Sequence, residues 1–359
     1  MKQEKIFSYG LIPRGSDRAK AYLYFREWAD RLFEFKGVRC GGSVVRVVLL
    51  ACVNNGYVEG SAKLLGVCGQ TVRNHLKYQD PLRFLQVNCE LVELLKKLGA
   101  FSKPLTLAID WHDVMYYGNP EAQGVVGTQP KKGSHYAYRF ATASVLLHGE
   151  RLTLAVAPIC GVGLLDQVKQ LINCVQSLGV KIRIVLFDRG YFSAELINYL
   201  NSQGLKYIIQ LPAVIKGLSE GEDFIYTTRS CRRPKNEQAT FRLVTFKAKD
   251  KGGKDKLFIF ATNTSLKPKR IRKLFKKRWG IETSYRMIRQ FQAKTTSKLY
   301  TLRKLYFYLA VLLYNIWVLL NFKKTTGITA YTLRLHITLC LCLQALTNME
   351  AGQTLVKQE

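Results

Sequence analysis

Two apolar stretches that each end in an aspartate constrain this chain more than any other feature. Residues 105–110, LTLAID, alternate β-favouring apolar residues and end at Asp110, and residues 182–188, IRIVLFD, run apolar into Asp188. A buried, unpaired carboxylate is costly, so each aspartate must pair with a cation or bind a metal. We therefore expect two adjacent strands that present their acids at one edge of a sheet. The alternative is that each aspartate merely caps the turn or helix that follows it.

A third acid, Glu282, distinguishes between these alternatives. It is the only Asp or Glu between Asp255 and Glu350, whereas residues 267–304 contain fourteen Lys and Arg. A solvated helix face normally mixes charges of both signs, so a lone acid among these cations indicates a specific role. Residues 272–291 have helical periodicity, which predicts one helix face carrying Phe275, Arg278, Glu282, Tyr285 and Arg289.

This order of aromatic, Arg, Glu and basic residue resembles the signature around the catalytic Glu of insertion-sequence transposases of the DDE superfamily. The usual form is Tyr, Arg, Glu, Lys; here Phe275 stands for the Tyr and Arg289 for the Lys. The string DRGYF at 188–192, followed by a β-rich stretch and then the Glu helix, is similar to the same family. The resemblance covers about residues 105–322. It implies a catalytic triad of Asp110, Asp188 and Glu282.

Three converging carboxylates would repel one another strongly, so their convergence implies divalent cations. Oxygen-only ligands select Mg²⁺ or Mn²⁺. Two such ions would activate a water or a DNA 3′-hydroxyl and stabilise the leaving oxygen of an in-line displacement. In this interpretation Asp110 bridges both ions, and Asp188 and Glu282 each hold one.

Several neighbours of the three acids are expected to support them. Arg278 and Arg289 would steady the DNA phosphate or Glu282, the alternative being plain helix-surface charge. Trp111 and Asp113 follow the first strand in a loop, and we expect them to contact and position the catalytic side chains. If Asp110 has only a structural role, Asp113 is the main alternative for the first catalytic acid.

The charge balance points to the partner. The 359 residues carry 55 Lys and Arg against 25 Asp and Glu, a formal net charge of +30. Such an excess implies a polyanion, most plausibly double-stranded DNA, with a membrane surface or an acidic protein as alternatives. The first residues do not resemble a signal peptide, and the nine scattered Cys indicate neither disulfides nor a structural zinc site. We expect a cytoplasmic, nucleoid-associated protein.

The first hundred residues are expected to be helical and to bind DNA. Ala62, Gly66 and Val72 have the spacing of a helix-turn-helix: a small residue at the crossing, a Gly in the turn and an apolar anchor in the second helix. The alternative is an ordinary αα-hairpin. The second helix, about 70–78, would expose donors for bases and phosphates, namely Gln70, Thr71, Arg73, Asn74 and Lys77.

From residue 105 the element order β, β, β, α, β, α, β predicts an α/β fold, with an RNase H-like mixed sheet and its helices, in which the first and fourth strands are neighbours. An all-β insertion interrupts this sheet and an all-helical DNA-binding region precedes it. Residues 229–256 hold ten Lys and Arg against three acids, so we expect the insertion to contact DNA, the alternative being a solvated loop. The predicted domains are 1–100, 101–350 with the β-rich basic insertion at 212–262, and a tail at 351–359.

The stretch 306–322 has seventeen residues without a charge. It is short for a membrane span, contains Asn315 and follows the proposed catalytic helix, so we expect no membrane partner and a helix buried against the sheet.

The predicted function is that of a transposase that binds the ends of a mobile DNA element and catalyses two-metal cleavage and strand transfer, as a homodimer or larger assembly on DNA. The alternatives are an RNase H-like nuclease that does not join strands, a catalytically silent DNA-binding protein derived from a transposase, and a membrane-associated basic protein.

Overall fold

The structure is a computed structural model, whose contacts divide the chain into two compact units. A helical unit comprises Met1–Leu95, Glu121–Gln123 and Ser284–Glu359, and a sheet unit comprises Lys96–Pro120 and Gly124–Thr283. The domain boundaries proposed from the sequence stay predictions, because compact units need not coincide with domains that fold alone. The structure describes residues 18–33, 41–147, 149–212, 215, 217–228, 237–249, 253, 255–278, 280–322 and 328–356.

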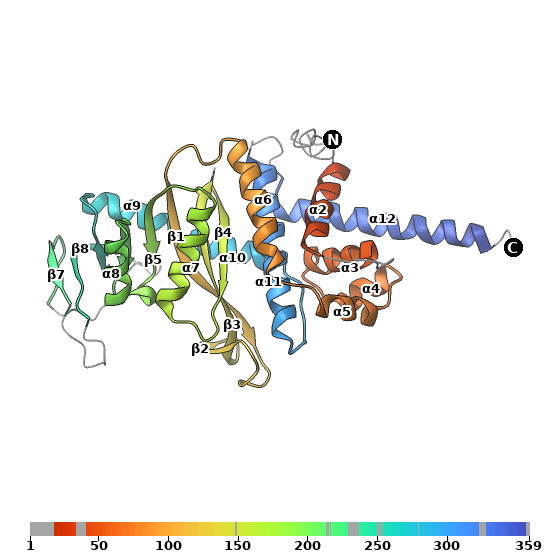
Figure 1. Ribbon diagram of the computed structural model, residues 1–359, viewed down its shortest axis with the longest axis horizontal. Coiled ribbons are helices and arrows are strands. Elements are labelled where there is room, and N and C mark those ends of the chain that lie inside the picture. The colour runs from red at the N-terminus through yellow and green to blue at the C-terminus, as the bar shows by residue number, and fades with distance from the viewer. Residues whose placement is uncertain are drawn as a thin grey trace. The chain divides into compact units, whose positions relative to one another are not determined.

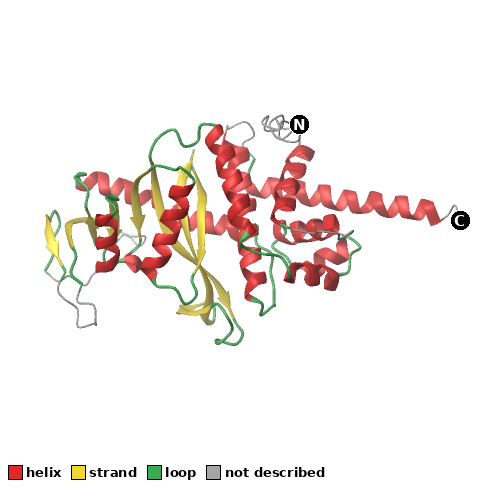
Figure 2. Ribbon diagram, in the orientation of Figure 1, coloured by secondary structure: helices red, strands yellow, loops and turns green. Residues whose placement is uncertain are grey.

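The described part of the sheet unit is built on one nine-stranded mixed sheet (Figure 2). Its strands follow the order β2-β3-β1-β5-β6-β9-β8-β7, and β4 pairs with β3. The strands are β1 (Leu105–Tyr116), β2 (Val125–Lys131), β3 (Ser134–Leu147), β4 (Glu150–Pro158), β5 (Ile182–Phe187), β6 (Tyr207–Gln210), β7 (Asp223–Thr227), β8 (Thr240–Lys249) and β9 (Asp255–Thr262).

The centre of this sheet has the predicted RNase H-like arrangement. β1 pairs antiparallel with β3 and parallel with β5, and β5 pairs parallel with β6. The strands that carry Asp110 and lead to Asp188 are therefore neighbours, as predicted. β5 is a run of apolar residues because a parallel strand at the centre of a sheet is covered on both faces.

The first strand is longer than predicted. We expected it to end at Asp110 and to be followed by a loop with Trp111 and Asp113, but β1 continues to Tyr116. It does so because β3 pairs with it in unbroken register from Leu107 to Tyr116. A further strand, β2, was not predicted from the sequence and forms a hairpin with β3.

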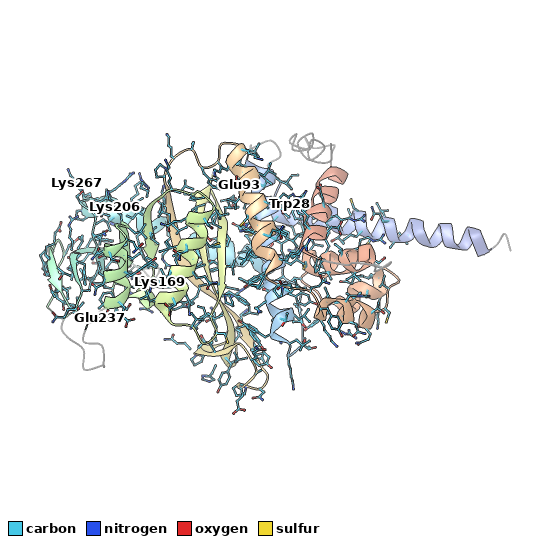
Figure 3. All side chains as sticks on the ribbon, in the orientation of Figure 1. Trp28, Glu93, Lys169, Lys206, Glu237 and Lys267 are labelled. Atoms are coloured by element: carbon cyan, nitrogen blue, oxygen red, sulfur yellow. The ribbon has the colours of Figure 1, made fainter. Side chains whose placement is uncertain are left out.

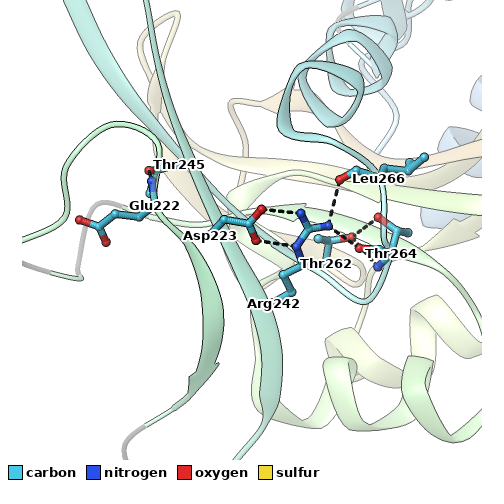
Figure 4. A network of polar contacts seen from close by, with 7 residues as sticks. All are labelled: Glu222, Asp223, Arg242, Thr245, Thr262, Thr264 and Leu266. Carbon is cyan, nitrogen blue, oxygen red and sulfur yellow. Dashed lines mark hydrogen bonds and ion pairs between the residues drawn. The ribbon is translucent and has the colours of Figure 1, made fainter.

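The predicted β-rich insertion is present, and it extends the central sheet. β9 pairs antiparallel with β6, and β8 and β7 follow outward. Arg242 of β8 donates to both carboxylate oxygens of Asp223 on β7, at 2.6 and 2.5 Å, and to the carbonyls of Thr264 and Leu266, at 2.7 and 2.9 Å (Figure 4). This guanidinium connects the outer strands to the segment that leads into the next helix.

Four helices begin in the sheet unit: α7 (Leu164–Ser177), α8 (Ala194–Ser202), α9 (Pro268–Arg278) and α10 (Gly280–Gln290). α7 buries Val168, Leu171, Ile172 and Val175, a helical repeat of apolar positions, against β3 and β4 (Figure 1). Ser193 caps α8 by accepting a hydrogen bond from the Leu196 amide. The single helix predicted over 272–291 is described as α9 and α10, on either side of residue 279, which lies outside the described residues.

The helical unit contains α2 (Arg18–Leu32), α3 (Gly41–Val53), α4 (Val58–Leu64), α5 (Gly69–Lys77), α6 (Arg83–Lys97), α11 (Tyr300–Phe322) and α12 (Ala330–Val356). α11 is long and apolar enough to cross a membrane, yet 94% of its most apolar window is buried inside the structure. Within its unit it contacts α2 and α5, and its Asn315 donates to Asn88 of α6. α12 runs through to Val356, so the loose tail predicted from residue 351 is helical as far as that residue.

Candidate active site

Asp110 and Asp188 meet where two parallel strands stop pairing. The last paired residues of β1 and β5 are Ile109 and Phe187, and each aspartate is the next residue on its strand. Arg278, the last residue of α9, donates from Nη1 to Asp110 Oδ2 at 2.7 Å, and its Nη2 lies 3.5 Å from Asp188 Oδ1. Two carboxylates and one guanidinium thus form a single ionic cluster.

Neither aspartate serves as a helix cap. Asp188 stands at the start of a short 3₁₀ turn (Arg189–Tyr191), but its side chain makes no capping hydrogen bond there. Asp110 lies in the middle of β1. Among the described residues, its Oδ1 accepts a hydrogen bond from the adjacent Trp111 amide, at 2.9 Å, and its Oδ2 accepts one from Arg278. The capping alternative therefore does not account for either carboxylate.

Burial dominates the electrostatics of the pair. The side chain of Asp110 is 14% exposed, and this burial raises its pKa from 3.8 to about 6. Arg278 opposes that rise by favouring the charged carboxylate, and the negative charge of Asp188 adds to it. One buried guanidinium is thus too little to hold Asp110 fully ionised.

Arg278 is positioned by the outer strands. One turn earlier on α9, Phe275 packs edge-on against Phe260 of β9 with ring centroids 4.8 Å apart, and Phe260 stacks on Phe246 of β8 at 5.2 Å. The Arg278 side chain is only 5% exposed, and its Nε finds no hydrogen-bond partner among the described residues. The β insertion therefore fixes the cation of the candidate site.

The DRGY string is explained by an aromatic stack beside the aspartates. The Trp111 ring lies 4.7 Å from that of Tyr191 and covers Gly190 so closely that a Cβ there would fall 2.5 Å from the Trp111 ring. Burial raises the pKa of Tyr191 well above its usual range, and its hydroxyl has no partner within the described part of the chain. Trp111 thus supports the pair, as predicted, by packing on the turn that follows Asp188.

Asp113 has a separate role. Arg139 of β3 donates to its two oxygens at 2.6 and 3.0 Å, and Thr128 of β2 donates at 2.9 Å. The side-chain hydrogen bonds from Arg139 lower the pKa of Asp113 despite its partial burial. Arg139 also lies over Trp111, 5.1 Å from the ring centroid. Asp113 is therefore committed to joining β1, β2 and β3. The sequence did not point to Arg139 or Thr128, because Thr128 lies in a strand that was not predicted and Arg139 reaches Asp113 only through the pairing of β3 with β1.

Glu282 is not gathered into the cluster in this structure. It is exposed on α10, whereas Arg278 and Tyr285 are buried. No group of three His, Cys, Asp or Glu side chains within the described ranges lies close enough to hold a metal ion. Asp110 and Asp188 by themselves fit a divalent cation, because their oxygens already converge on one positive charge and the buried hydroxyl oxygen of Tyr191 has no partner among the described residues.

Two helices, α4 and α5, lie at the predicted helix-turn-helix, and their role as a DNA-binding motif rather than an ordinary αα-hairpin stays a prediction. Ala62 and Val72 are fully buried, and Gly66 adopts φ 66° in the turn, a conformation that favours glycine. The five predicted DNA-contacting residues lie on the exposed and half-buried side of α5. Three of these five residues are linked by hydrogen bonds, because Arg73 donates to Gln70 at 2.6 Å and Gln70 donates to Asn74 at 2.8 Å. Arg73 also donates to Glu59. The other two of the five are Thr71 and Lys77.

Two predicted DNA contacts remain, Arg289 and the basic insertion. Arg289 is half-buried on α10, and its backbone carbonyl accepts a hydrogen bond from Asn55 at 2.7 Å. The basic insertion is only partly visible, since residues 229–236 lie outside the described residues. Its proposed contact with DNA remains a prediction.

Comparison with known proteins gives the family. The transposase DDE domain family matches residues 101–316, more than half of the chain and the segment that contains all three predicted acids. The chain belongs to this transposase family. No curated protein sequence matches the chain.

Two solved transposase structures are similar to this one. A cryo-EM structure of a piggyBac transposase synaptic complex with hairpin DNA matches with a TM-score of 0.54 at 11% identity, covering 85% of this chain and 71% of that chain. A crystal structure of a pre-cleavage Mos1 transpososome matches with a TM-score of 0.18 at 14% identity, covering 42% and 53% of the two chains, and supports no conclusion. The first similarity concerns the fold, which is that of a transposase with an RNase H-like catalytic domain.

The raised pKa of Asp110 predicts a pH-dependent stability. Between about pH 4 and 6 the folded protein keeps a proton that the unfolded chain has released, so this carboxyl favours folding below about pH 4 and loses that effect as the pH rises through about 6. Asp110→Asn removes the titration. The free energy of unfolding of this variant, relative to wild type, should increase by on the order of 2–3 kcal/mol from pH 4 to 7. Urea unfolding without divalent cations measures it, and a difference that stays constant with pH would contradict the raised pKa.

The contact between Gly190 and Trp111 predicts a coupled pair. Gly190→Ala should lower the free energy of unfolding by about 1–3 kcal/mol, because the new Cβ collides with the Trp111 ring, which also contacts Tyr191 and Arg139. In a Trp111→Leu background the same substitution should cost much less, which a double-mutant cycle measures. Gly127→Ala is the control, since a Cβ there meets nothing within 4 Å. An equal cost of Gly190→Ala in both backgrounds would contradict the steric account.

Proposed function

We propose that this transposase cleaves phosphodiester bonds at the ends of a mobile DNA element and joins the freed 3′ ends to target DNA, with Asp110, Asp188 and Glu282 as its catalytic carboxylates. The single observation that carries the proposal is that the β1–β5 pair ends at Asp110 and Asp188 and directs both toward one positive charge. A site that concentrates two carboxylates around a cation fits metal-assisted chemistry on phosphates. The net charge of +30 fits a DNA substrate.

Asp110 and Asp188 would hold a divalent cation, Mg²⁺ or Mn²⁺, in the place that Arg278 now occupies. When bound, one or two such ions lower the pKa of the attacking hydroxyl and stabilise the leaving oxygen. Glu282 follows Arg278 by four residues, so its Cα lies at most about 14 Å from that of Arg278. We propose that Glu282 completes the ligand set once DNA is bound, and that Arg278, displaced from the aspartates, pairs with a DNA phosphate.

The helix-turn-helix supports recognition of the element ends. Gln70 and Asn74 are exposed on α5, and the hydrogen bond from Gln70 to Asn74 fixes their orientation. Amide side chains of this kind read adenine in the major groove, and Arg reads guanine. Tyr285 and Arg289 of α10 are proposed as further DNA contacts on the strength of the family signature. Glu59 holds Arg73 until a base or a phosphate competes for it.

Joining requires two DNA ends and a target to be held together, so we propose a homodimer or larger assembly on DNA. The basic stretch 229–256 is the proposed contact for the second end. An RNase H-like nuclease that does not join strands would need neither the larger assembly nor a contact for a second DNA end. Work on chromosomal DNA also implies the nucleoid as the place of action.

The carboxylate assignment makes a direct prediction. Asp110→Ala, Asp188→Ala and Glu282→Ala should each abolish Mg²⁺-dependent cleavage and the joining of pre-cut ends, because each removes a ligand. DNA affinity should change little, because binding rests on Lys and Arg. Cleavage and gel-shift assays measure the two properties separately. Glu220→Ala, another exposed acid of the sheet unit, is the control. Full cleavage by the Glu282→Ala protein would remove Glu282 from the site.

The α5 interface makes a second prediction. Arg73→Ala should reduce discrimination at one or two base pairs of the element end by roughly 1–3 kcal/mol, as loss of a base contact does. Lys77→Ala should instead weaken binding to all sequences alike. Competition binding with single-base variants of the end measures both. Unchanged discrimination in the Arg73→Ala protein would assign α5 to a structural αα-hairpin.

A further inference from the structure

The hairpin formed by β2 and β3 ends in a tight, fixed turn. Lys131 pairs with Ser134, and the two residues between them, Lys132 and Gly133, have φ of 51° and 80°. Two consecutive residues with positive φ define the hairpin turn that matches the twist of paired strands. The tip projects at one end of the central sheet (Figure 1).

The base of this hairpin is anchored to the strand that carries Asp110. Arg139 of β3 and Thr128 of β2 both donate to Asp113 of β1, and Arg139 and Asp113 are both mostly buried. Nearer the tip, the Ser134 hydroxyl donates to the carbonyl of Tyr116, the last residue of β1. Bonds at both levels make the hairpin a rigid extension of β1.

The side chains at the tip suit a polyanion. Lys131, Lys132 and His135 are exposed, and no Asp or Glu occurs between Glu121 and Glu150. Two tyrosines are exposed beside them: Tyr117 at 67%, whose hydroxyl donates to the Lys132 carbonyl at 3.0 Å, and Tyr136 at 39%. Large aromatic side chains that project into solvent next to cations are poor core residues and good contacts for sugar and phosphate.

We propose that the tip of the β2–β3 hairpin is a DNA-binding element that holds the duplex beside the cleavage site, an inference that rests on the proposed function. A two-stranded ribbon fits the major groove, and lysines and tyrosine hydroxyls bind phosphates. From Asp110 to Tyr116 the register with β3 is unbroken, so at about 3.3 Å per residue the tip lies about 30 Å from the aspartates, and Tyr136, which pairs with Tyr116, lies about 20 Å from them. The shorter of these lengths corresponds to about six base pairs of duplex.

The first test is the salt dependence of DNA affinity. Lys131→Gln/Lys132→Gln should lower the slope of log affinity against log salt by about 2 on a mixed-sequence duplex, because two phosphate contacts are lost. The control is Lys181→Gln/Lys206→Gln, which removes the same charge from two exposed residues that directly precede β5 and β6. Lys206 lies well away from the hairpin (Figure 3). An unchanged melting temperature confirms that both variants fold.

A slope that falls by about 2 in the hairpin variant and by less than half as much in the control supports the proposal. Equal effects of the two variants would overturn the proposal, because the hairpin lysines would then contribute to DNA affinity only through the overall positive charge of the protein. A wild-type protein that does not bind the duplex at all would overturn the proposed function as well, so the two failures are distinguishable.

Cross-linking tests which part of the DNA lies beside the hairpin. A photoreactive benzophenone residue in place of Tyr136 should cross-link to DNA about six base pairs from the cleaved phosphate, and the same residue in place of Lys206 should not. Cross-links from position 136 to a second protein chain, with none to DNA, would show that the tip binds protein and would overturn the proposal.

Discussion

The buried guanidinium of Arg278 between Asp110 and Asp188 is the interaction on which the sheet unit depends. Two carboxylates at the ends of neighbouring strands repel each other, and burial penalises both, so the end of the β1–β5 pair requires a positive charge. Even with Arg278 in place, burial raises the pKa of Asp110 to about 6. Removing one partner from such a buried cluster typically costs about 3–5 kcal/mol, whereas exchanging one cation for another leaves it intact.

The outer strands of the sheet hold Arg278 in this position. β9 and β8 supply the phenylalanines on which α9 rests, and Arg242 ties β7 and β8 to the segment entering α9. These contacts bring the last residue of α9, Arg278, to the aspartates. The stretch whose composition predicts a DNA-binding insertion thus also supports the ionic cluster of Asp110, Asp188 and Arg278. Its basic loop remains a candidate for DNA contact.

Much of this fold could be predicted from the sequence, because local patterns determine it. The apolar run of β5 and the order of strands and helices were sufficient to place Asp110 beside Asp188, and the family signature singled out Arg278. Long-range contacts were not predictable in the same way. The continuation of β1 through Asp113 depends on pairing with β3, and the charge of Asp113 is balanced by Arg139, twenty-six residues away.

Glu282 shows the limit most clearly. Its isolation among cations predicted a role, yet the distance between a helix and a strand end depends on tertiary packing, and here the acid is exposed and apart from the aspartates. Sequence identifies the residue types that a metal needs. It does not specify which cation the carboxylates hold in the free protein, and the structure has Arg278 in that place.

The exchange of Arg278 for a metal is therefore the central claim, and Mn²⁺ binding without DNA tests it most directly. Electron paramagnetic resonance titration can compare wild type, Arg278→Gln and Arg278→Gln/Asp188→Asn. The account predicts at least about tenfold tighter Mn²⁺ binding by Arg278→Gln than by wild type, since a competing charge is removed from the site, and loss of that gain in the double variant. Equal Mn²⁺ affinity of wild type and Arg278→Gln, or a gain that survives Asp188→Asn, would contradict it.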